Sequence, residues 1–261
     1  MSIFKNLQLE RRGPALWIWL NRPEVKNAFT LEMAEDFLQA VQMGMKDKTV
    51  SVLVLSGRGG VWSAGGDIKK MSETQNLKKF FLQISRTVNR VLLEIRNGKP
   101  VLAAIPGYVG GIAFGAVLAA DLRIASSTAQ FNAATIRLGL VANGGATYFL
   151  PRLVGLGRAT EILLLGDILS AEQALQVGLV GRVVPPESLE RETQSTAERL
   201  AAGPQQALRR LKKTLQVGLH SSLATQLERE CQAIAWSAST EDFQEGMRAF
   251  LEKRKAKFWR C

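Results

Sequence analysis

The segment VWSAGGDI, residues 61–68, follows a short apolar run at residues 50–56 after the four residues GRGG. A second glycine-rich segment, PGYVGGI at residues 106–112, follows the apolar run 100–105 and opens an apolar stretch that continues to Ala120. Short apolar runs predict buried strands, and glycines after a strand let a ligand approach the backbone closely. Two such turns can direct free backbone N–H groups toward one point, which suits a developing oxyanion. The glycines could instead only permit tight packing of strand against helix, and the residues alone leave both interpretations open.

The common nucleotide-binding and hydrolase signatures are absent from the sequence. No Gly-x-Gly-x-x-Gly motif opens a helix after a strand, and no phosphate loop ends in Gly-Lys-Ser/Thr. Ser63 lies one glycine short of a nucleophile elbow, and the single histidine, His220, would have to act as its base. We therefore expect no serine hydrolysis. With one histidine and two cysteines we also expect no metal site.

The composition indicates a globular protein with an unusual charge. The 261 residues suit one domain of ordinary size with a helical appendage. With 34 basic and 23 acidic residues the net charge is +11, which favours polyanionic partners such as nucleic acid, a membrane surface or a phosphorylated cofactor. No apolar stretch reaches the roughly 18 residues of a membrane span, and no secretory signal pattern is visible. The sequence predicts a cytoplasmic protein without a membrane partner.

Alternating strand and helix signals predict an α/β fold. Residues 7–11 and 16–20 are expected to form a β-hairpin, and Thr30 is expected to cap a helix. Apolar residues at helical spacing predict a helix over 77–95 that ends at Asn97-Gly98, and the second glycine-rich segment predicts a buried helix over 110–118. Further strands are expected at residues 50–55, 101–105 and 122–125.

The second half of the chain, from about Gly144, carries mostly helical signals. Gly203-Pro204 breaks this pattern, and helices are expected after it at residues 205–217, 221–236 and 240–253. We therefore divide the chain into a core, residues 1–202, and a helical C-terminal region, residues 203–261.

Eight segments of the chain resemble the enoyl-CoA hydratase/isomerase (crotonase) superfamily and follow one another in the family's order over nearly the whole length. They are LNRPEVKNA (20–28), WSAGGDI (62–68), ADLRIA (120–125), LGL (138–140), PRLVG (151–155), LSAEQA (169–174), GLV (178–180) and EGMRAFLEKR (245–254).

The resemblance implies the crotonase (ClpP-like) fold, in which repeated ββα units form two roughly perpendicular sheets. The helical C-terminal region would then build a homotrimer or a dimer of trimers. The substrate implied is a coenzyme A thioester, with no permanently bound cofactor. Matching the motifs residue by residue gives the backbone N–H groups of Gly66 and Ile112 as the oxyanion hole for the thioester carbonyl.

The family match also implies residues that hold coenzyme A. They are Val25, Lys26, Ala28, Ala64, Gly65, Asp67 and Ile68, with Lys253 and Lys257 contributed by a neighbouring subunit. Lys26 could equally be a solvated loop lysine. The carboxylate of Asp67 is expected to be structural, bonded to the amides of its turn.

Three positions depart from the family pattern because the family's catalytic carboxylates are replaced. The two glutamates of hydratases correspond to Gly115 and Thr135, and the aspartate of some isomerase and dehalogenase-like members corresponds to Asn143. Water addition needs a positioned acid and base, each contributing ~10²–10⁴-fold to the rate. Glycine contributes neither, and threonine and asparagine can only form hydrogen bonds at neutral pH. We therefore reject standard hydration by the two-glutamate route.

Several other residues could supply or orient the missing proton, and the sequence does not rank them. They are Glu73, Tyr108, Asn132, Arg137, Tyr148, His220 and Trp236. The sequence thus predicts an acyl-CoA-processing enzyme of isomerase, decarboxylase or C–C lyase type. The alternative is a non-catalytic acyl-CoA-binding protein or a basic RNA-binding member of the family. The absence of aromatic residues between the basic ones argues against a nucleic-acid partner.

Overall fold

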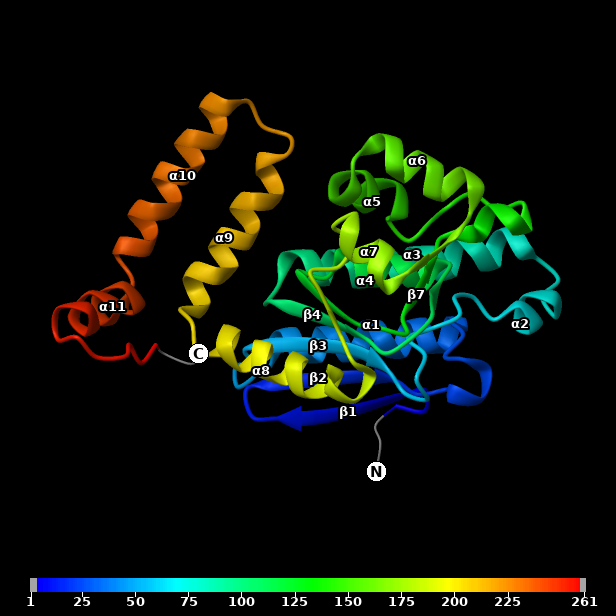
Figure 1. Ribbon diagram of the computed structural model, residues 1–261, viewed down its shortest axis with the longest axis horizontal. Helices are drawn as coiled ribbons and strands as arrows, with labels where there is room; N and C mark the ends of the chain where they lie inside the picture. Colours follow the sequence, from blue (N-terminus) through cyan, green and yellow to red (C-terminus); the bar gives the residue numbers. More distant parts are fainter. Residues whose placement is uncertain (1–3, 259–261) are drawn as a thin grey trace.

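The computed structural model describes residues 4–258 and shows a mixed α/β core from which a helical C-terminal region projects (Figure 1). Within these residues the larger sheet has the strand order β1 (Leu7–Arg12), β2 (Ala15–Leu20), β3 (Val52–Gly57), β4 (Val101–Ile105), β6 (Leu122–Ser126) and β9 (Arg182–Val184). The smaller sheet has the order β5 (Val109–Gly110), β7 (Gln130–Asn132) and β8 (Ile168–Ser170). The predicted α/β class with two sheets is confirmed.

In the larger sheet, whether two neighbouring strands run parallel or antiparallel agrees with the length of the segment that connects them. The predicted hairpin is present, because β1 and β2 pair antiparallel with Leu7 opposite Leu20. All other pairs in the larger sheet are parallel, and the segments between them cross over through helices. In the smaller sheet β5 and β7 are parallel, whereas β7 and β8 are antiparallel.

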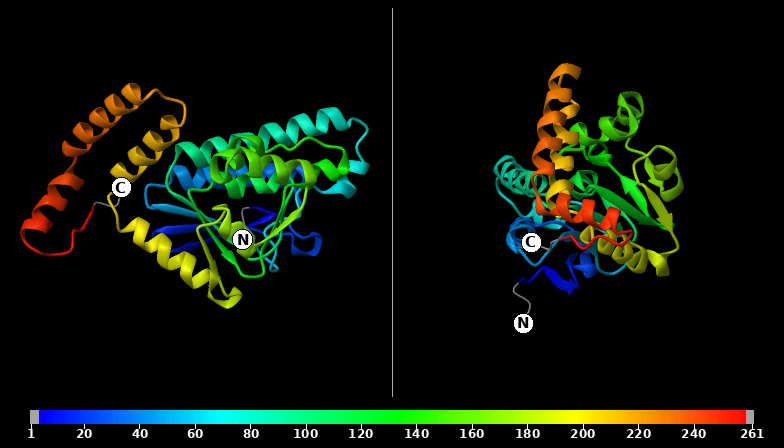
Figure 2. Two further views of the ribbon diagram at one scale, coloured as in Figure 1. Left: turned by 45° about the horizontal axis from the view of Figure 1, so that its top comes forward. Right: turned by 90° about the vertical axis from the view of Figure 1, so that its left-hand side faces the viewer.

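Helices cover both faces of the larger sheet (Figures 1 and 2). The α-helices of the core are α1 (Leu31–Lys46), α2 (Ile68–Ser72), α3 (Leu77–Asn97), α4 (Ile112–Ala119), α5 (Ala146–Val154), α6 (Leu156–Leu165), α7 (Ala171–Gln176) and α8 (Leu189–Ala201). Short 3₁₀ turns are η1 (Pro23–Val25), η2 (Ala134–Leu138) and η3 (Pro186–Ser188). Alternate strand residues pack in two apolar clusters, one with α1, α3 and α4 and the other with α8.

Two predicted helix boundaries match the structure closely. The backbone N–H of Met33 donates to Thr30 Oγ1 over 3.2 Å, which is the expected cap of α1. α3 ends at Asn97 and is followed by Gly98. The helix predicted from residue 110 begins instead at Ile112, because Val109 and Gly110 pair with β7.

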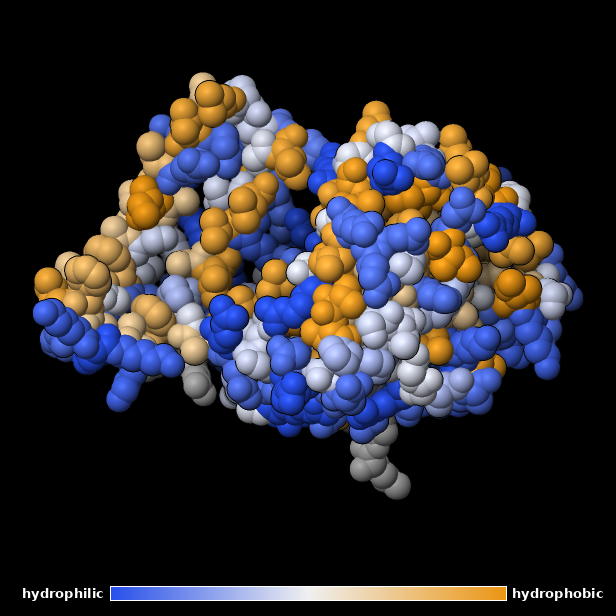
Figure 3. All heavy atoms as spheres, in the orientation of Figure 1, coloured by the Kyte–Doolittle hydropathy of each residue, from blue (hydrophilic) through white to orange (hydrophobic). Residues whose placement is uncertain are grey.

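The C-terminal region follows the predicted break at Gly203-Pro204. It comprises α9 (Gln205–Gly218), α10 (Leu223–Ala238) and α11 (Glu241–Leu251). Figures 1 and 2 show α9 and α10 as an antiparallel hairpin that stands away from the core, with α11 at its outer end. Many large apolar side chains of this hairpin are exposed, and they form part of the orange surface in Figure 3.

Candidate active site

The two glycine-rich turns that open the sequence argument lie against each other. The backbone N–H of Gly110 donates to the carbonyl oxygen of Ser63 over 2.9 Å, and the N–H of Ser63 donates to the carbonyl oxygen of Tyr108 over 3.2 Å. A Cβ atom on Gly65, whose φ is +97°, would lie 2.9 Å from the carbonyl oxygen of Gly110. Position 65 therefore requires glycine for both conformation and space. A Cβ on Gly111 would lie 3.9 Å from the nitrogen of Gly66, so the first turn meets the start of α4.

Several backbone donors near this junction have no acceptor within residues 4–258, and two of them lie where the turns meet. They are the N–H groups of Gly66 and Ile112. The other donors of the two turns are bonded: Ala64 bonds Lys26, Gly65 bonds Ser63, Asp67 bonds Phe29, Gly110 bonds Ser63 and Gly111 bonds Asn132. The N–H groups of Ile68 and Ala113, in the first turns of α2 and α4, lack an acceptor as helix starts usually do. Ile112 is the first residue of α4, where the helix dipole places about half a positive charge. The junction can thus stabilise a negative oxygen without any charged side chain.

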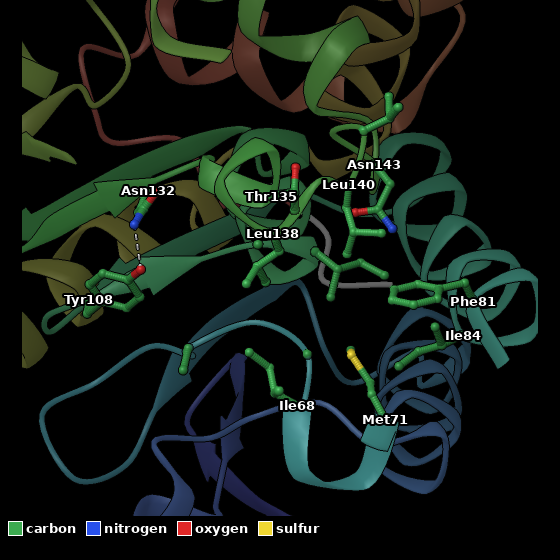
Figure 4. Close-up of a pocket in the computed structure, with 15 residues that line it drawn as sticks. Ile68, Met71, Phe81, Ile84, Tyr108, Asn132, Thr135, Leu138, Leu140 and Asn143 are labelled. Carbon is green, nitrogen blue, oxygen red and sulfur yellow. Dashed lines mark hydrogen bonds between the residues drawn. The ribbon is translucent and has the colours of Figure 1, made fainter. Parts of the chain in front are cut away.

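A cavity of about 260 Å³ opens beside these donors (Figure 4). It is lined by Ala64, Gly66, Ile68, Met71, Phe81, Ile84, Tyr108, Gly111, Ile112, Asn132, Thr135, Leu138, Leu140, Val141 and Asn143. Helices α2 and α3 supply one wall, and the segment from η2 to Asn143 supplies the opposite wall. At the mouth Leu138 is 61% exposed and Val141 82% exposed. The cavity suits an apolar acyl chain.

The polar side chains of the cavity are uncharged. Tyr108 accepts a hydrogen bond at its hydroxyl from Asn132 Nδ2 over 2.8 Å, drawn in Figure 4. Asn143 donates from Nδ2 to Ser85 Oγ on α3 over 3.1 Å, so its amide is held against that helix. Thr135 is partly exposed, with its hydroxyl 3.4 Å from the carbonyl oxygen of Ala133. Among the described residues that line the cavity, none is an aspartate, glutamate, histidine, lysine or arginine.

The structure gives a steric reason for glycine at position 115. This residue lies one turn along α4 from the donor Ile112 and is buried. A Cβ atom there would overlap the carbonyl oxygen of Gly144, a backbone group that cannot swing aside as a side chain does. The turn that contains Gly144, whose φ is +60°, therefore fills the space a side chain at position 115 would need.

The residues predicted for coenzyme A divide into three groups. Ala64, Gly65 and Ile68 lie at the turn, and Ala64 and Ile68 line the cavity. Val25 and Lys26 are exposed on and after η1, and the backbone of Lys26 touches the turn through the N–H of Ala64, which donates over 2.8 Å.

The other predicted residues do not reach the cavity in one chain. Ala28 is buried. Asp67 accepts from the backbone N–H of Lys70 over 3.2 Å and pairs with Arg22 over 3.2 Å, so its carboxylate caps α2. Lys253 and Lys257 follow α11, far from α2 in the same chain (Figure 1).

Most of the alternative proton donors lie elsewhere. Glu73 pairs with Lys70 over 2.8 Å on the exposed side of α2, and Arg137 pairs with Asp167 over 3.1 Å. Tyr148 and His220 hydrogen-bond each other over 3.0 Å between α5 and the α9–α10 turn. The structure thus brings Tyr108, Asn132, Thr135 and Asn143 to the cavity and leaves those four residues outside it.

Trp236 also lies outside the cavity. It is on α10 and packs under the guanidinium of Arg210 on α9, with 4.6 Å between the guanidinium carbon and the ring centre. The contact joins the two helices of the C-terminal hairpin.

Several cavity residues carried no signal of their own in the sequence. Ser85, which orients Asn143, lies 58 positions before it in the chain. Met71 and Val141 are ordinary apolar residues, Leu138 and Leu140 were noted only as part of a family-like segment, and Phe81 and Ile84 were expected only as the apolar face of a helix. The apolar faces of α2 and η2 could have suggested these residues, but only once the position of both helices relative to the glycine turns was known.

The described part of the chain lacks two features, a helix suited to crossing a membrane and a cluster of metal-binding side chains. Over residues 4–258, no helix combines the length and the apolar character that crossing a membrane requires. Within the same range, no three aspartate, glutamate, histidine or cysteine side chains gather as a metal would require.

These features define an α/β protein with paired backbone donors above an apolar cavity. The chain belongs to the enoyl-CoA hydratase/isomerase family, whose model matches residues 11–260. It is 34% identical to trans-2-decenoyl-[acyl-carrier-protein] isomerase of Streptococcus mutans over 98% of both chains. It is 33% identical to crotonyl-CoA hydratase of Syntrophomonas wolfei, again over 98% of both. The crystal structure of enoyl-CoA hydratase from Bacillus anthracis superposes with a TM-score of 0.93 at 30% identity, covering 97% of this chain and 99% of that one.

Proposed function

We propose that this protein binds an acyl thioester with its carbonyl oxygen between the N–H groups of Gly66 and Ile112. The observation that carries the proposal is that these two donors lack acceptors in the described structure and lie where the two glycine-rich turns meet. Both residues also line the cavity. Two preorganised donors stabilise the enolate more than the ground-state carbonyl, and loss of one such donor costs about 3–4 kcal/mol of transition-state stabilisation.

The chemistry that we propose avoids a carboxylate base. Decarboxylation or C–C cleavage forms an enolate from the electrons of the broken carbon–carbon bond, so the protein need not remove a proton from the α-carbon. The remaining step returns a proton to that carbon. Tyr108 is the donor that we assign, because its hydroxyl is in the cavity and is positioned by Asn132. Isomerisation is the third reaction that we propose. Its enolate forms by loss of a proton, so it also needs a group other than a protein carboxylate to accept that proton.

The thioester carrier that we propose is coenzyme A. Ala64, Gly65 and Ile68 would hold the pantetheine arm beside the hole, and Val25 and Lys26 lie exposed next to that turn. Two relatives are named for coenzyme A and for acyl-carrier-protein substrates respectively, and in both carriers the thioester ends a pantetheine arm. The thioester is a substrate here, and no resident cofactor is required.

The protein is proposed to form a homotrimer, or a dimer of trimers, through its C-terminal region. Exposed apolar side chains support this proposal, among them Leu211, Leu215, Leu219, Leu223, Ile234 and Phe250. Contiguous exposed apolar surface of this kind marks an interface. Assembly would also bring Lys253 and Lys257 of one subunit to the site of another. Light scattering on the purified protein measures the mass; a monomer would contradict the proposal.

One experiment tests the reaction class. The protein is incubated in deuterated water with saturated acyl-, enoyl- and β-carboxyacyl-CoA thioesters, and product masses and α-carbon deuterium are followed. We expect decarboxylation, cleavage or double-bond migration, with deuterium at the α-carbon and little hydration of crotonyl-CoA. Hydration at the rate of ordinary hydratases would overturn the proposal. Binding without exchange or turnover would favour the non-catalytic alternative.

A further inference from the structure

The outer face of α3 carries an exposed stripe of basic residues. The acid that follows it on the helix, Glu94, lies one turn beyond Arg90 and accepts a hydrogen bond from Gln42 of α1. Lys79, Arg86 and Arg90 are exposed and lie within about 40° of one another around the helix axis, given 3.6 residues per turn. Leu82, 45% exposed, lies on the same side. None of the three cations forms an ion pair with another residue of the described chain. We call these four residues the basic face of α3.

The basic face belongs to a helix that also lines the cavity. Phe81 and Ile84 of α3 form part of the cavity wall, so the basic face is separated from the acyl site by about one helix diameter, 10–12 Å. The surrounding segment is one-sided in charge. Residues 68–90 contain six basic side chains and a single acid, Glu73, which pairs with Lys70. The local potential is therefore positive on the side of α3 that faces away from the cavity.

We propose that the basic face of α3 docks an acidic carrier protein, which would deliver the acyl thioester into the nearby cavity on its pantetheine arm as a second source of substrate besides coenzyme A. This inference rests on the proposed function, and charge complementarity identifies the partner. The charges extend over about 16 Å of helix at 1.5 Å per residue, which suits a protein surface better than one compact phosphate group. Leu82 adds an apolar contact between the cations, as protein interfaces require. No exposed aromatic residue accompanies the stripe, unlike a surface that stacks single-stranded nucleic acid.

Binding is measured first, because it does not depend on turnover. A fluorescently labelled bacterial acyl carrier protein in its holo form is titrated with the full chain at low and at physiological salt. The test variant is K79E/R86E, and the matched control is K46E/K48E. The control residues are exposed lysines at the far end of α1, beyond the opposite end of α3. We expect the test variant to weaken binding at least tenfold and the control to change it less than twofold, with wild-type binding falling as salt rises.

A kinetic experiment separates docking of the carrier protein from catalysis. The same acyl group is offered on carrier protein, on coenzyme A and on pantetheine. K79E/R86E should lower kcat/KM at least tenfold for the carrier-borne substrate and leave the pantetheine thioester within twofold of wild type. An equal loss on all three would overturn the inference, as would a loss on coenzyme A alone, which would assign the face to coenzyme A phosphates.

Three binding results would also overturn the inference. They are absence of carrier binding, an equal loss in the control variant, and tighter binding of single-stranded RNA than of the carrier at the same salt. If wild type binds the carrier but turns over no thioester, the proposed function fails while the docking surface stands. If pantetheine thioesters are turned over but the carrier is not bound, the docking surface fails alone.

Discussion

The two ends of α3 differ in the side chains that lie beside them: one end borders an uncharged cavity, and the other borders a cluster of buried charged groups. At the N-terminal end, Phe81 and Ile84 face a cavity whose described lining contains no ionised side chain. At the C-terminal end, Lys99, Lys212 and Asp121 are packed together with backbone carbonyls. The chain therefore can bury charge, but it does so outside the cavity.

At the C-terminal end of α3, the buried charged side chains connect neighbouring elements through hydrogen bonds. Lys212 Nζ on α9 donates to the carbonyl oxygen of Lys99 over 2.9 Å and to Asp121 over 2.6 Å, and Asp121 also accepts from the N–H of Val101 over 2.8 Å. Burial lowers the pKa of Lys212, and the neighbouring Asp121 carboxylate opposes that effect. Lys99 Nζ donates to the carbonyl oxygen of Gly44 over 2.9 Å. These bonds join α9, α3, β4 and α1.

The comparison teaches how the cavity can act on a thioester. The polarising groups that we propose are backbone donors held by two turns, and the described side chains that line the cavity offer uncharged hydrogen bonds only. A reaction there depends on the substrate and on a neutral proton donor. The charged groups of this chain stabilise the fold and its C-terminal helices instead. Four predictions test this division.

The largest effect is expected at the backbone donor of α4. Ile112→Pro removes the N–H at the first helical position, where proline is well accepted because that N–H has no partner within the helix. Gly111 before it has no Cβ to clash with the proline ring. We expect kcat to fall about 10²–10³-fold, with substrate still bound. Single-turnover kinetics and substrate titration measure the two quantities.

Ile112→Val is the matched control, because it keeps the N–H and removes one methylene. It should cost less than about 1.5 kcal/mol of stability and retain most activity. Equal activity of the proline and valine variants would show that this donor does not polarise the thioester.

Much of this donor site was predictable from the sequence alone. Strand runs followed by glycines are local signals, and they pointed to the two turns before any contact was known. The resemblance to the family then named Gly66 and Ile112 as the donors, and that assignment stays a prediction. The hairpin of β1 and β2, the Thr30 cap and the end of α3 are local in the same sense. Each depends on residues within a few positions of one another.

The remaining features depend on contacts between distant positions, which one sequence does not reveal. The overlap that bars a side chain at Gly115 comes from Gly144, 29 positions later. The strands β5, β7, β8 and β9 have two or three residues, too few to show the alternation that identifies a strand. The division of the chain at residue 203 stays a prediction, although the link between α8 and α9 lies there.

The second prediction tests why the cavity lacks a side chain at position 115. Gly115→Ala would force Cβ into the carbonyl of Gly144, so we expect a loss of about 2–3 kcal/mol in the free energy of unfolding. Gly157→Ala on α6 is the control, because nothing lies within 4 Å of a Cβ there. It should be neutral or slightly stabilising. Urea denaturation compares the two, and an equal response would mean that the turn at Gly144 yields easily.

The third prediction adds a charge to the cavity. Asn143→Asp is nearly isosteric and places a carboxylate beside Ser85, whose hydroxyl can then donate to it. A base in reach of the α-carbon should raise deuterium exchange of a saturated acyl-CoA about tenfold, within the range of general-base catalysis but reduced by an unoptimised position. Ser85→Ala in the same background should lower that gain, since the carboxylate loses its positioning bond. Unchanged exchange in Asn143→Asp would place Asn143 out of reach of the α-carbon.

The smallest effect concerns Lys99, at the other end of α3. Burial lowers the pKa of Lys99 to about 8, against roughly 10.4 in an unfolded chain. Between these values the folded protein has released a proton that the unfolded chain still holds, so stability should rise as pH increases from about 8 to 10. Its bonds to the carbonyl oxygens of Gly44 and Asp47 favour the charged form and keep the effect small.

Lys99→Met isolates this contribution, because Lys212 and the other groups titrate in both proteins. Urea denaturation at closely spaced pH values should show wild type gaining stability relative to Lys99→Met above pH 8, with a constant difference below it. Parallel profiles across the whole range would mean that Lys99 keeps its ordinary pKa in the folded state. The charge at this end of α3 would then be solvated rather than buried, and the contrast with the uncharged cavity would rest on Lys212 and Asp121 alone.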